Sequence, residues 1–510
     1  MSHRRAYGAA LTLVALLGAA LRLFPIWFGL PYPHTRPDEE TTLGHALAIL
    51  AGDPNPHFFN WPSLTFYLFA GLFGLASAIW RPLTSEDYVL IARATVALAG
   101  TATILVLARL GSRLATRPAG LLAAFFLSVA TLHVRDSHFA LTDVLMTLLV
   151  TGSLTLLVAA QQTHSIRQTA LAGLLGGLAT STKYNAAAIV ASMAALHWRW
   201  PRRSGARSPS LAFLGALAAG FLLATPFALL DPRAFATDVL FESRHLAGGH
   251  AILLGRGWTY HLARSLPYGL GLGIFAAALA GIVPMAIHHR RPALVVGAFA
   301  AAFFAAIGSG QTVFFRYVMP LVPIACLSAA VAVTHAGVWL ARRARLPAPA
   351  AVALLGLLVA APSLTNSLWL DVLLARTDTR VLAGRWLAPR LRPETTLADT
   401  GGDYAKLDFG GLAFHDWRYD RVSQSFGDPA GRTPDWIVVD DSPLPEYTAA
   451  PAALRALVSE RYDMVHEVRG LTARAGAAIY DRQDAFFLPI AGFSGVERPG
   501  PTVRIYRRRD

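Results

Sequence analysis

The dominant pattern along the chain is a series of long apolar stretches between residues 7 and 369, followed by mixed polar and apolar positions up to the C-terminus. A helix of about 20 apolar residues crosses the hydrocarbon core of a bilayer, so each long stretch is a candidate transmembrane helix. We therefore expect a mainly α, polytopic membrane protein. The pattern predicts about eleven spans, at residues 7–30, 88–108, 118–135, 143–160, 169–182, 184–199, 209–229, 264–287, 292–309, 317–339 and 347–369.

The region from residue 370 to residue 510 has the pattern of a small α/β domain. Short β-type runs alternate there with two helical segments, at about 371–389 and 449–459. The candidate strands are residues 395–398, 436–439, 464–468, 478–480 and 503–506. The pair Gly401 and Gly402 is too little for a nucleotide-binding fingerprint. This favours a structural or acceptor-side domain over a second catalytic site.

The charge distribution separates the same two regions. The chain has a formal net charge of +14, with 54% hydrophobic and 15% charged residues. Residues 1–369 carry 26 basic and 11 acidic side chains, whereas residues 370–510 carry 19 and 20. The basic surplus thus belongs to the membrane part, where it reports orientation and gives no support to nucleic-acid binding. A lone cysteine, Cys326, excludes an internal disulfide and a multi-cysteine metal site.

The basic turns predict the topology. Arg4 and Arg5 should be cytoplasmic, and so should the turn containing Arg109, so an even number of crossings must separate them. Helices 7–30 and 88–108 supply two, so the apolar run 61–80 should lie along or dip into the outer face. The other predicted cytoplasmic turns hold Arg167; Arg199, Arg202, Arg203 and Arg207; Arg290 and Arg291; and Arg342, Arg343 and Arg345. The N-terminus is then cytoplasmic, and the C-terminal domain is extracytoplasmic.

Acidic side chains on the predicted outer face are candidate catalytic groups, because charges at membrane depth are costly and usually face a cavity or a partner. Asp38 and Glu39 are adjacent carboxylates, which suits either a base with a raised pKa or a cation site. Asp143 opens an apolar helix on the same predicted face. The alternative for both Asp38 and Asp143 is a helix N-cap.

Two basic residues on this face are candidates for phosphate binding. Lys183, with Tyr184, lies between two short apolar stretches and is the sole lysine of residues 1–369. An ammonium group on a flexible stem suits a phosphate, although it also suits snorkelling to the interface. Arg316, with Tyr317, opens a later span and is either a second phosphate contact or an interfacial anchor.

Two further features remain open. The outer loop 230–263 has the length of a lid or substrate loop. The histidines His34, His45, His57, His133 and His138 lack metal-ligand spacing. This spacing argues against a metal site built from histidines and leaves the carboxylates as the candidate ligands. If a divalent cation is bound, Asp38, Glu39 and Asp143 are the candidate ligands.

Several short motifs, in this order, resemble the bacterial family 39 glycosyltransferases, which are relatives of the protein O-mannosyltransferases and of the lipid A aminoarabinose transferase. The resemblance covers roughly residues 7–340. It is carried by residues 36–40, 44–47 and 56–64, by Arg93 and Asp143, and by residues 182–184 and 316–323. Many members read His-Pro-Pro-Leu where this chain has Asn60, Trp61, Pro62, Ser63 and Leu64. His57 is a candidate substitute for that histidine.

The resemblance implies a GT-C bundle over residues 1–369, with residues 31–87 as the first outer loop, including juxtamembrane helices. It implies a sugar donor on a polyprenyl phosphate and an active site at the outer face of the bacterial cytoplasmic membrane. The family's acid pair corresponds to Asp38 and Glu39, its second-loop aspartate to Asp143, and its phosphate-contacting lysine to Lys183. The acceptor could be a lipid, a glycan or a protein. The rival interpretations are a transporter or flippase of lipid-linked sugars, a related polymerase or ligase, and a membrane-anchored assembly protein.

Overall fold

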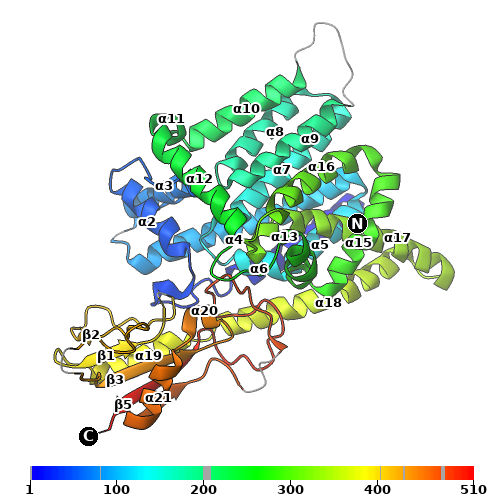
Figure 1. Cartoon of the computed structure of the whole chain (residues 1–510). Helices are drawn as coiled ribbons and strands as arrows, with labels where there is room; N and C mark the ends of the chain where they lie inside the picture. Colours follow the sequence, from blue (N-terminus) through cyan, green and yellow to red (C-terminus); the bar gives the residue numbers. More distant parts are fainter. Residues whose placement is uncertain are drawn as a thin grey trace. The chain divides into compact units, whose positions relative to one another are not determined.

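The computed structural model describes residues 3–80, 82–198, 208–402, 404–428, 431–472 and 477–509. The described chain divides into two compact units (Figure 1). The membrane unit contains Met1–Ile26 and Thr41–Leu368. The C-terminal unit contains Trp369–Asp510 together with an early segment, Trp27–Glu40. The sequence pattern did not anticipate that this early segment associates with the last third of the chain.

The regular secondary structure described in the membrane unit is helical, apart from an isolated bridge between His250 and Ile252. Its helices include α1 (His3–Leu23), α2 (Glu39–Leu50), α3 (Leu64–Ile79), α4 (Ser85–Leu114), α5 (Arg117–Val129), α6 (Thr131–Asp136), α7 (Thr142–Thr163), α8 (Ile166–Thr180), α9 (Ile189–His197), α10 (Pro209–Ala224), α11 (Phe227–Leu230), α12 (Pro232–Gly248), α13 (Gly257–Tyr260), α14 (Leu266–Leu270), α15 (Leu272–His288), α16 (Arg290–Gly308), α17 (Leu321–Ala344) and α18 (Ala348–Leu374). Short 3-10 helices at Tyr184–Ala188 (η2) and Phe315–Val318 (η4), and a π-helical turn at His261–Ser265 (η3), interrupt the series. Of these elements, α2 begins and α18 ends in the C-terminal unit.

Six helices in the described part of the chain are long and apolar enough to cross a membrane, or seven if one bent pair is counted as a span. The chain is therefore a multi-pass membrane protein, but the predicted count of eleven is not reached by this measure. Several predicted spans are shorter than a bilayer-crossing helix, as in α5 and α10. Helix α3 falls in the same class of shorter apolar helices, so helix length does not test its exclusion from the predicted spans.

Three predicted spans differ from the helices of the structure, and each difference has a physical cause. The first helix ends at Leu23 instead of residue 30, since Pro25 lacks an N–H group and disfavours helical geometry in the residue before it. The stretch 118–135 breaks at Ala130 between α5 and α6. The hydroxyls of Ser363 and Ser367 donate to the Val129 carbonyl at this break, at 2.8 and 2.9 Å, so the freed carbonyl keeps partners in the apolar surroundings.

The stretch 264–287 is also broken. The segment Gly257–Leu270 meets α15 at an angle of 117°. Gly271, at the break, has a φ of +79°, a conformation that glycine adopts without steric cost. The predicted cytoplasmic turn at Arg199, Arg202, Arg203 and Arg207 lies outside the described residues.

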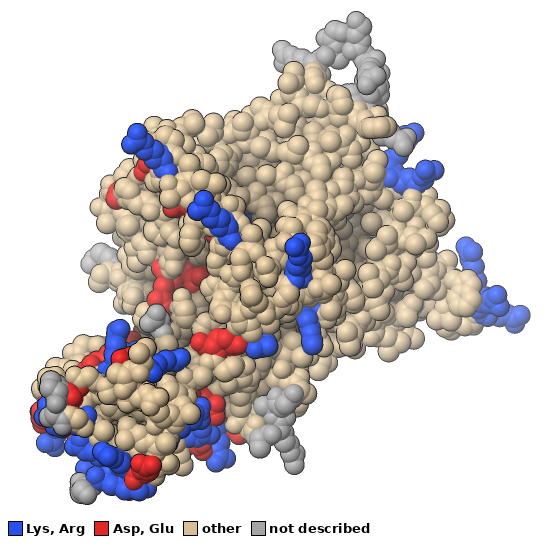
Figure 2. Space-filling model, in the orientation of Figure 1, with Lys and Arg blue, Asp and Glu red and all other residues tan. Residues whose placement is uncertain are grey.

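Small residues bring helices of the membrane unit into close contact. A methyl group at Gly173 or Gly177 of α8 would collide with the backbone of α10, at Phe213 and Leu217 respectively. Lipid tails are as apolar as leucine, so helix association in membranes depends on such close packing. In Figure 2 the visible surface outside the C-terminal unit is broadly uncharged, as expected of a surface that faces lipid.

The C-terminal unit is a three-layer α/β/α structure. Its sheet has the order β2-β1-β3-β5-β4, formed by β1 (Thr396–Asp399), β2 (His415–Asp416), β3 (Trp436–Asp441), β4 (Tyr462–Val468) and β5 (Thr502–Arg508). Strands β1, β2 and β3 are parallel, and β5 is antiparallel to both β3 and β4. The helical elements are α19 (Thr379–Leu387), η5 (Ala388–Arg390), α20 (Pro445–Thr448) and α21 (Ala452–Arg461).

Alternating residues of the strands supply the two cores of this unit. Trp436 and Val438 pack toward α19, whereas Ile437 and Val439 pack toward α21. This period of two follows from strand geometry. The prediction of a helical bundle with a small C-terminal α/β region is confirmed. One predicted strand was wrong, since residues 478–480 form an isolated bridge between Ile479 and Ala491.

Candidate functional site

A buried ion pair in the membrane unit joins two of the predicted site residues. The Lys183 ammonium lies 2.7 Å from Oδ1 of Asp143, and their side chains are 13% and 3% exposed. Asp143 is in the first turn of α7, and Lys183 directly precedes η2. The N-cap of α7 is Leu141, so Asp143 is not a cap. The break between α8 and η2 thus places a lysine against a helix start some 40 residues earlier in the chain.

Arg316 and Tyr317 complete this group. Nε of Arg316 lies 4.0 Å from Oδ2 of Asp143, and the Lys183 ammonium lies 4.5 Å from the centre of the Tyr317 ring. Both residues belong to η4, not to the first turn of a long span as predicted, because α17 begins after Pro320. We call Asp143, Lys183, Arg316 and Tyr317 the membrane cluster. Its two cations outnumber its one carboxylate in a site of low exposure, which favours an anion such as a phosphate.

The same charge balance does not suit a metal. Asp143 is already neutralised by Lys183, and a second cationic group stands near it. In the described ranges no group of three or more His, Cys, Asp or Glu side chains has the arrangement of a metal site. We therefore derive no chemical step that passes through a divalent cation.

Tyr184 is bonded to the segment between α2 and α3. Its hydroxyl donates to the Phe59 carbonyl at 2.7 Å, and the Phe59 amide donates to Asp238 of α12 at 2.7 Å. Part of the predicted lid loop 230–263 is therefore the helix α12, bonded to the loop that contains Phe59. His57 lies on the surface of that loop, 64% exposed and 3.2 Å from Asp53.

The predicted acid pair, Asp38 and Glu39, belongs to the C-terminal unit. Glu39 is the first residue of α2 and is buried, whereas Asp38 is partly exposed and has a φ of +69°. Left-handed backbone at a non-glycine residue is uncommon, and such strain gathers at functional sites. Nearby, His34 contacts Glu40 at 2.7 Å, and this hydrogen bond raises the pKa of His34.

A buried ion pair joins this segment to the last third of the chain through Arg36. Its Nη1 lies 2.6 Å from Oδ1 of Asp484, with both side chains almost fully buried. The two residues are 448 positions apart in the chain. Sequence analysis placed Arg36 in a motif but did not single out Asp484, since no local pattern links the two.

Two other charged pairs were also missed. Arg135 and Asp136 form a buried ion pair at the end of α6, with a distance of 2.9 Å. Adjacent opposite charges within an apolar run were the signal that could have revealed them.

The second missed pair, Asp399 and Asp440, lies in the C-terminal unit. Asp399 is the last residue of β1, and Asp440 is the second-last residue of β3, the neighbouring parallel strand. Burial raises the pKa of Asp399 to about 6 and holds that of Asp440 well above its usual range, with Asp399 nearby adding to the effect.

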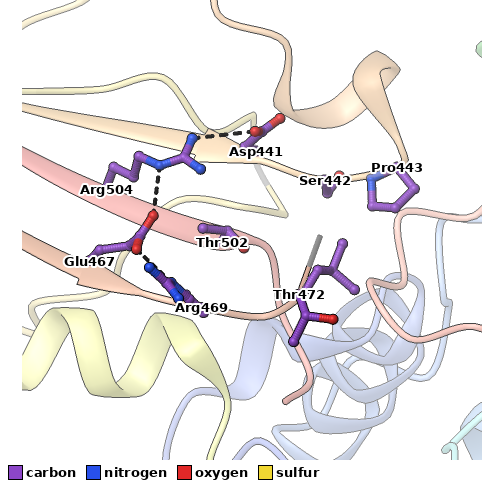
Figure 3. A pocket seen from close by; sticks show the side chains of 9 residues that line it. Asp441, Ser442, Pro443, Glu467, Arg469, Thr472, Thr502 and Arg504 are labelled. Carbon is purple, nitrogen blue, oxygen red and sulfur yellow. Dashed lines mark hydrogen bonds and ion pairs between the residues drawn. The ribbon is translucent and has the colours of Figure 1, made fainter. Parts of the chain in front are cut away.

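A polar cavity of about 560 Å³ opens on the C-terminal unit (Figure 3). Along one side, Arg504 of β5 bridges Asp441 of β3 at 3.3 Å and Glu467 of β4 at 2.9 Å, and Arg469 contacts Glu467 at 2.7 Å. The two arginines and two acids balance in charge. This arrangement does not favour a strongly anionic ligand.

Comparison with known proteins supplies the class of the fold. Residues 85–230 match the family described as dolichyl-phosphate-mannose-protein mannosyltransferase, a segment of less than a third of the chain. The chain resembles the apo oligosaccharyltransferase of Archaeoglobus fulgidus, with a TM-score of 0.56 and 12% identity, over 98% of this chain and 88% of that one. A search of curated protein sequences gave no match.

A second similar structure is apo ArnT from Cupriavidus metallidurans, with a TM-score of 0.54 and 16% identity over 99% of this chain and 98% of that one. The same protein bound to undecaprenyl phosphate gives 0.51 and 14%, over 98% and 97%. At these identities the likeness is one of fold. The fold is that of the GT-C membrane glycosyltransferases, and the resemblance found in the sequence is confirmed at this level.

Proposed function

We propose that this protein transfers a sugar from a polyprenyl-phosphate donor to an acceptor at the outer face of a bacterial cytoplasmic membrane. The observation that carries the proposal is the membrane cluster, where Lys183 and Arg316 flank Asp143 in a buried site of a GT-C fold. Fixed cations in a site of reduced dielectric stabilise the charge that develops on a leaving phosphate. That ArnT was crystallised with undecaprenyl phosphate supports this class of donor.

In the proposed reaction, an acceptor hydroxyl or amine attacks the anomeric carbon of the sugar. A new bond forms at this carbon as its bond to the phosphate oxygen breaks, so the configuration inverts in a single displacement. Asp38 takes the acceptor proton as general base. Lys183 and Arg316 stabilise the departing polyprenyl phosphate, and Glu39 and Asp143 orient the sugar or the acceptor. Tyr184, Tyr317 and His57 are further candidates for substrate contact.

The proposed topology keeps the N-terminus in the cytoplasm and the C-terminal unit outside. The glycosyltransferase domain is proposed to span residues 1–369, and the outer α/β domain residues 370–510. Segment Trp27–Glu40 is shared between them, since it lies in the first part of the chain but packs within the C-terminal unit.

The deciding experiment is in vitro transfer by the purified full chain with a panel of polyprenyl-phosphate sugars, monitored by release of polyprenyl phosphate. Release that requires an acceptor is the expected result. Lipid-linked sugar that crosses liposomes without release would instead identify a transporter or flippase. Products that grow by many sugar units would identify a related polymerase.

A further inference from the structure

The segment that carries Asp38 and Glu39 is built into the C-terminal unit. Trp27–Glu40 clusters with Trp369–Asp510, although more than 320 residues of the membrane unit separate the two in sequence. Its contacts therefore show what holds the proposed base in place.

The central contact is the Arg36–Asp484 ion pair. The same guanidinium nitrogen, Nη1, lies 2.6 Å from Asp484 Oδ1 and donates to the Pro37 carbonyl at 3.2 Å. That carbonyl belongs to the peptide group that precedes Asp38. The guanidinium also lies 5.5 Å from the centre of the Phe486 ring. An unbroken series of contacts thus runs from Asp484 through Arg36 to the backbone of Asp38.

Further contacts hold the residues that precede Arg36 and Asp38 in the chain. The Tyr32 hydroxyl donates to the Lys406 carbonyl at 2.6 Å, and the Tyr32 ring lies 5.1 Å from the Arg380 guanidinium. Arg380 is itself held by both carboxylate oxygens of Asp378. Phe28 packs edge-on against Phe486. The backbone leading to Asp38 is therefore anchored at several positions within one unit.

We propose that Asp484 is a positioning residue for the transfer reaction. Through Arg36 and the Pro37 carbonyl it holds Asp38 in its left-handed conformation. The proposal rests on the proposed function, in which Asp38 is the base. A buried charge pair is a poor source of net stability but fixes geometry when its hydrogen bonds are satisfied. Misplacement of a reacting group by about 1 Å can cost about 100-fold in rate.

The test compares Asp484→Asn with the matched control Asp463→Asn, both in the full chain. Asp463 is 66% exposed and pairs with Arg509, away from the segment. We expect kcat to fall about 100-fold in Asp484→Asn with the donor KM changed less than about threefold, because the base is misplaced while donor binding is untouched. The control should keep both values, and Asp484→Glu should recover part of the rate.

A double-mutant cycle distinguishes positioning from general damage. If Asp484 acts through Asp38, Asp484→Asn should not further lower the residual rate of Asp38→Asn. The acidic limb of the kcat/KM pH profile should also shift in Asp484→Asn, since that limb reports the base. A folded Asp484→Asn enzyme with the wild-type kcat and pH profile would overturn the proposal. An active Asp38→Asn enzyme would overturn the base assignment, and with it the proposed mechanism.

A second variant covers the case in which Asp484→Asn fails to fold. Replacing both partners, as Arg36→Met with Asp484→Leu, removes the two opposite charges together and should lower the melting temperature less than Asp484→Asn does. It removes the donor to the Pro37 carbonyl, so we expect a loss in kcat comparable to that of Asp484→Asn. A stable double variant with undiminished kcat would reject the positioning role.

Discussion

The two groups of predicted site residues differ in how the protein builds them. The membrane cluster joins Asp143, Lys183 and Arg316 within the membrane unit, each next to a helix break or a helix start. Asp38 and Glu39 instead lie at the start of α2. The segment that precedes them belongs to the C-terminal unit, where Arg36 pairs with Asp484. The membrane cluster has two cationic side chains within a helical bundle. The pair Asp38 and Glu39 has two carboxylates in a segment of the C-terminal α/β unit. The proposed division between phosphate binding and base chemistry corresponds to this difference.

The largest expected effect comes from Asp38→Asn. If this side chain is the base, loss of its carboxylate should lower transfer by about 10²- to 10⁴-fold. Release of polyprenyl phosphate by purified enzyme measures the effect, with melting temperature and membrane insertion as controls. Activity near wild type would remove the base role from the C-terminal unit and abolish the proposed division.

The membrane cluster should respond to Lys183→Met with a loss of about 10²- to 10³-fold in kcat, the scale of one fixed group that stabilises charge in a transition state. Because this variant leaves Asp143 buried without its 2.7 Å partner, the double variant Lys183→Met with Asp143→Asn is the stability control. Lys183→Arg should recover part of the rate. Equal kcat in all variants would show that the ion pair is only structural.

The stability of the C-terminal unit should depend on pH in a way that the membrane unit does not share. Burial raises the pKa of Asp399 to about 6 and raises that of Asp440 well above its usual range, so these two carboxyl groups bind protons more tightly in the folded unit than in the unfolded chain. The contribution of this pair to the stability of the unit should be greatest below the usual aspartate pKa and should fall as pH rises through about 6. Hydrogen exchange of β3 in the full chain, corrected for intrinsic rates, should show weaker protection at pH 8 than at pH 5.

Asp440→Asn should flatten this dependence, because it removes one of the two buried carboxyl groups whose pKa is raised. Amides of α7 in the membrane unit provide the internal reference. Protection of β3 that increases with pH in the wild-type protein would contradict the assignment.

The smallest effect is expected at the polar cavity. Arg504 is 29% exposed, and its partners Glu467 and Asp441 are 20% and 47% exposed. Pairs of this kind contribute about 0–1 kcal/mol. Arg504→Gln should therefore lower the melting temperature by a few degrees at most and leave kcat unchanged. An increased KM for the acceptor alone would instead identify the cavity as an acceptor subsite.

Sequence periodicity was sufficient for the class of fold and for most elements, because long apolar stretches and alternating strands are local signals. Span boundaries failed where the break depended on distant groups. At the break between α5 and α6, the Val129 carbonyl accepts hydrogen bonds from Ser363 and Ser367 of α18. Nothing in residues 118–135 reveals these partners. Arg316 and Tyr317 were placed at a span start because hydrophobicity alone does not distinguish η4 from α17.

The candidate site shows the same limit. Residue type and the family resemblance singled out Asp38, Asp143, Lys183 and Arg316, since charged groups beside apolar helices are conspicuous in a sequence. The partners of these residues could not be predicted from the sequence. An ion pair between residues 448 positions apart forms only when the fold brings the two segments together. The sequence by itself determined a multi-pass helical protein with a small α/β region and a set of charged candidates. Only the tertiary structure decided that Lys183 pairs with Asp143 and that Asp484 pairs with Arg36, because burial and distance are properties of the packed chain.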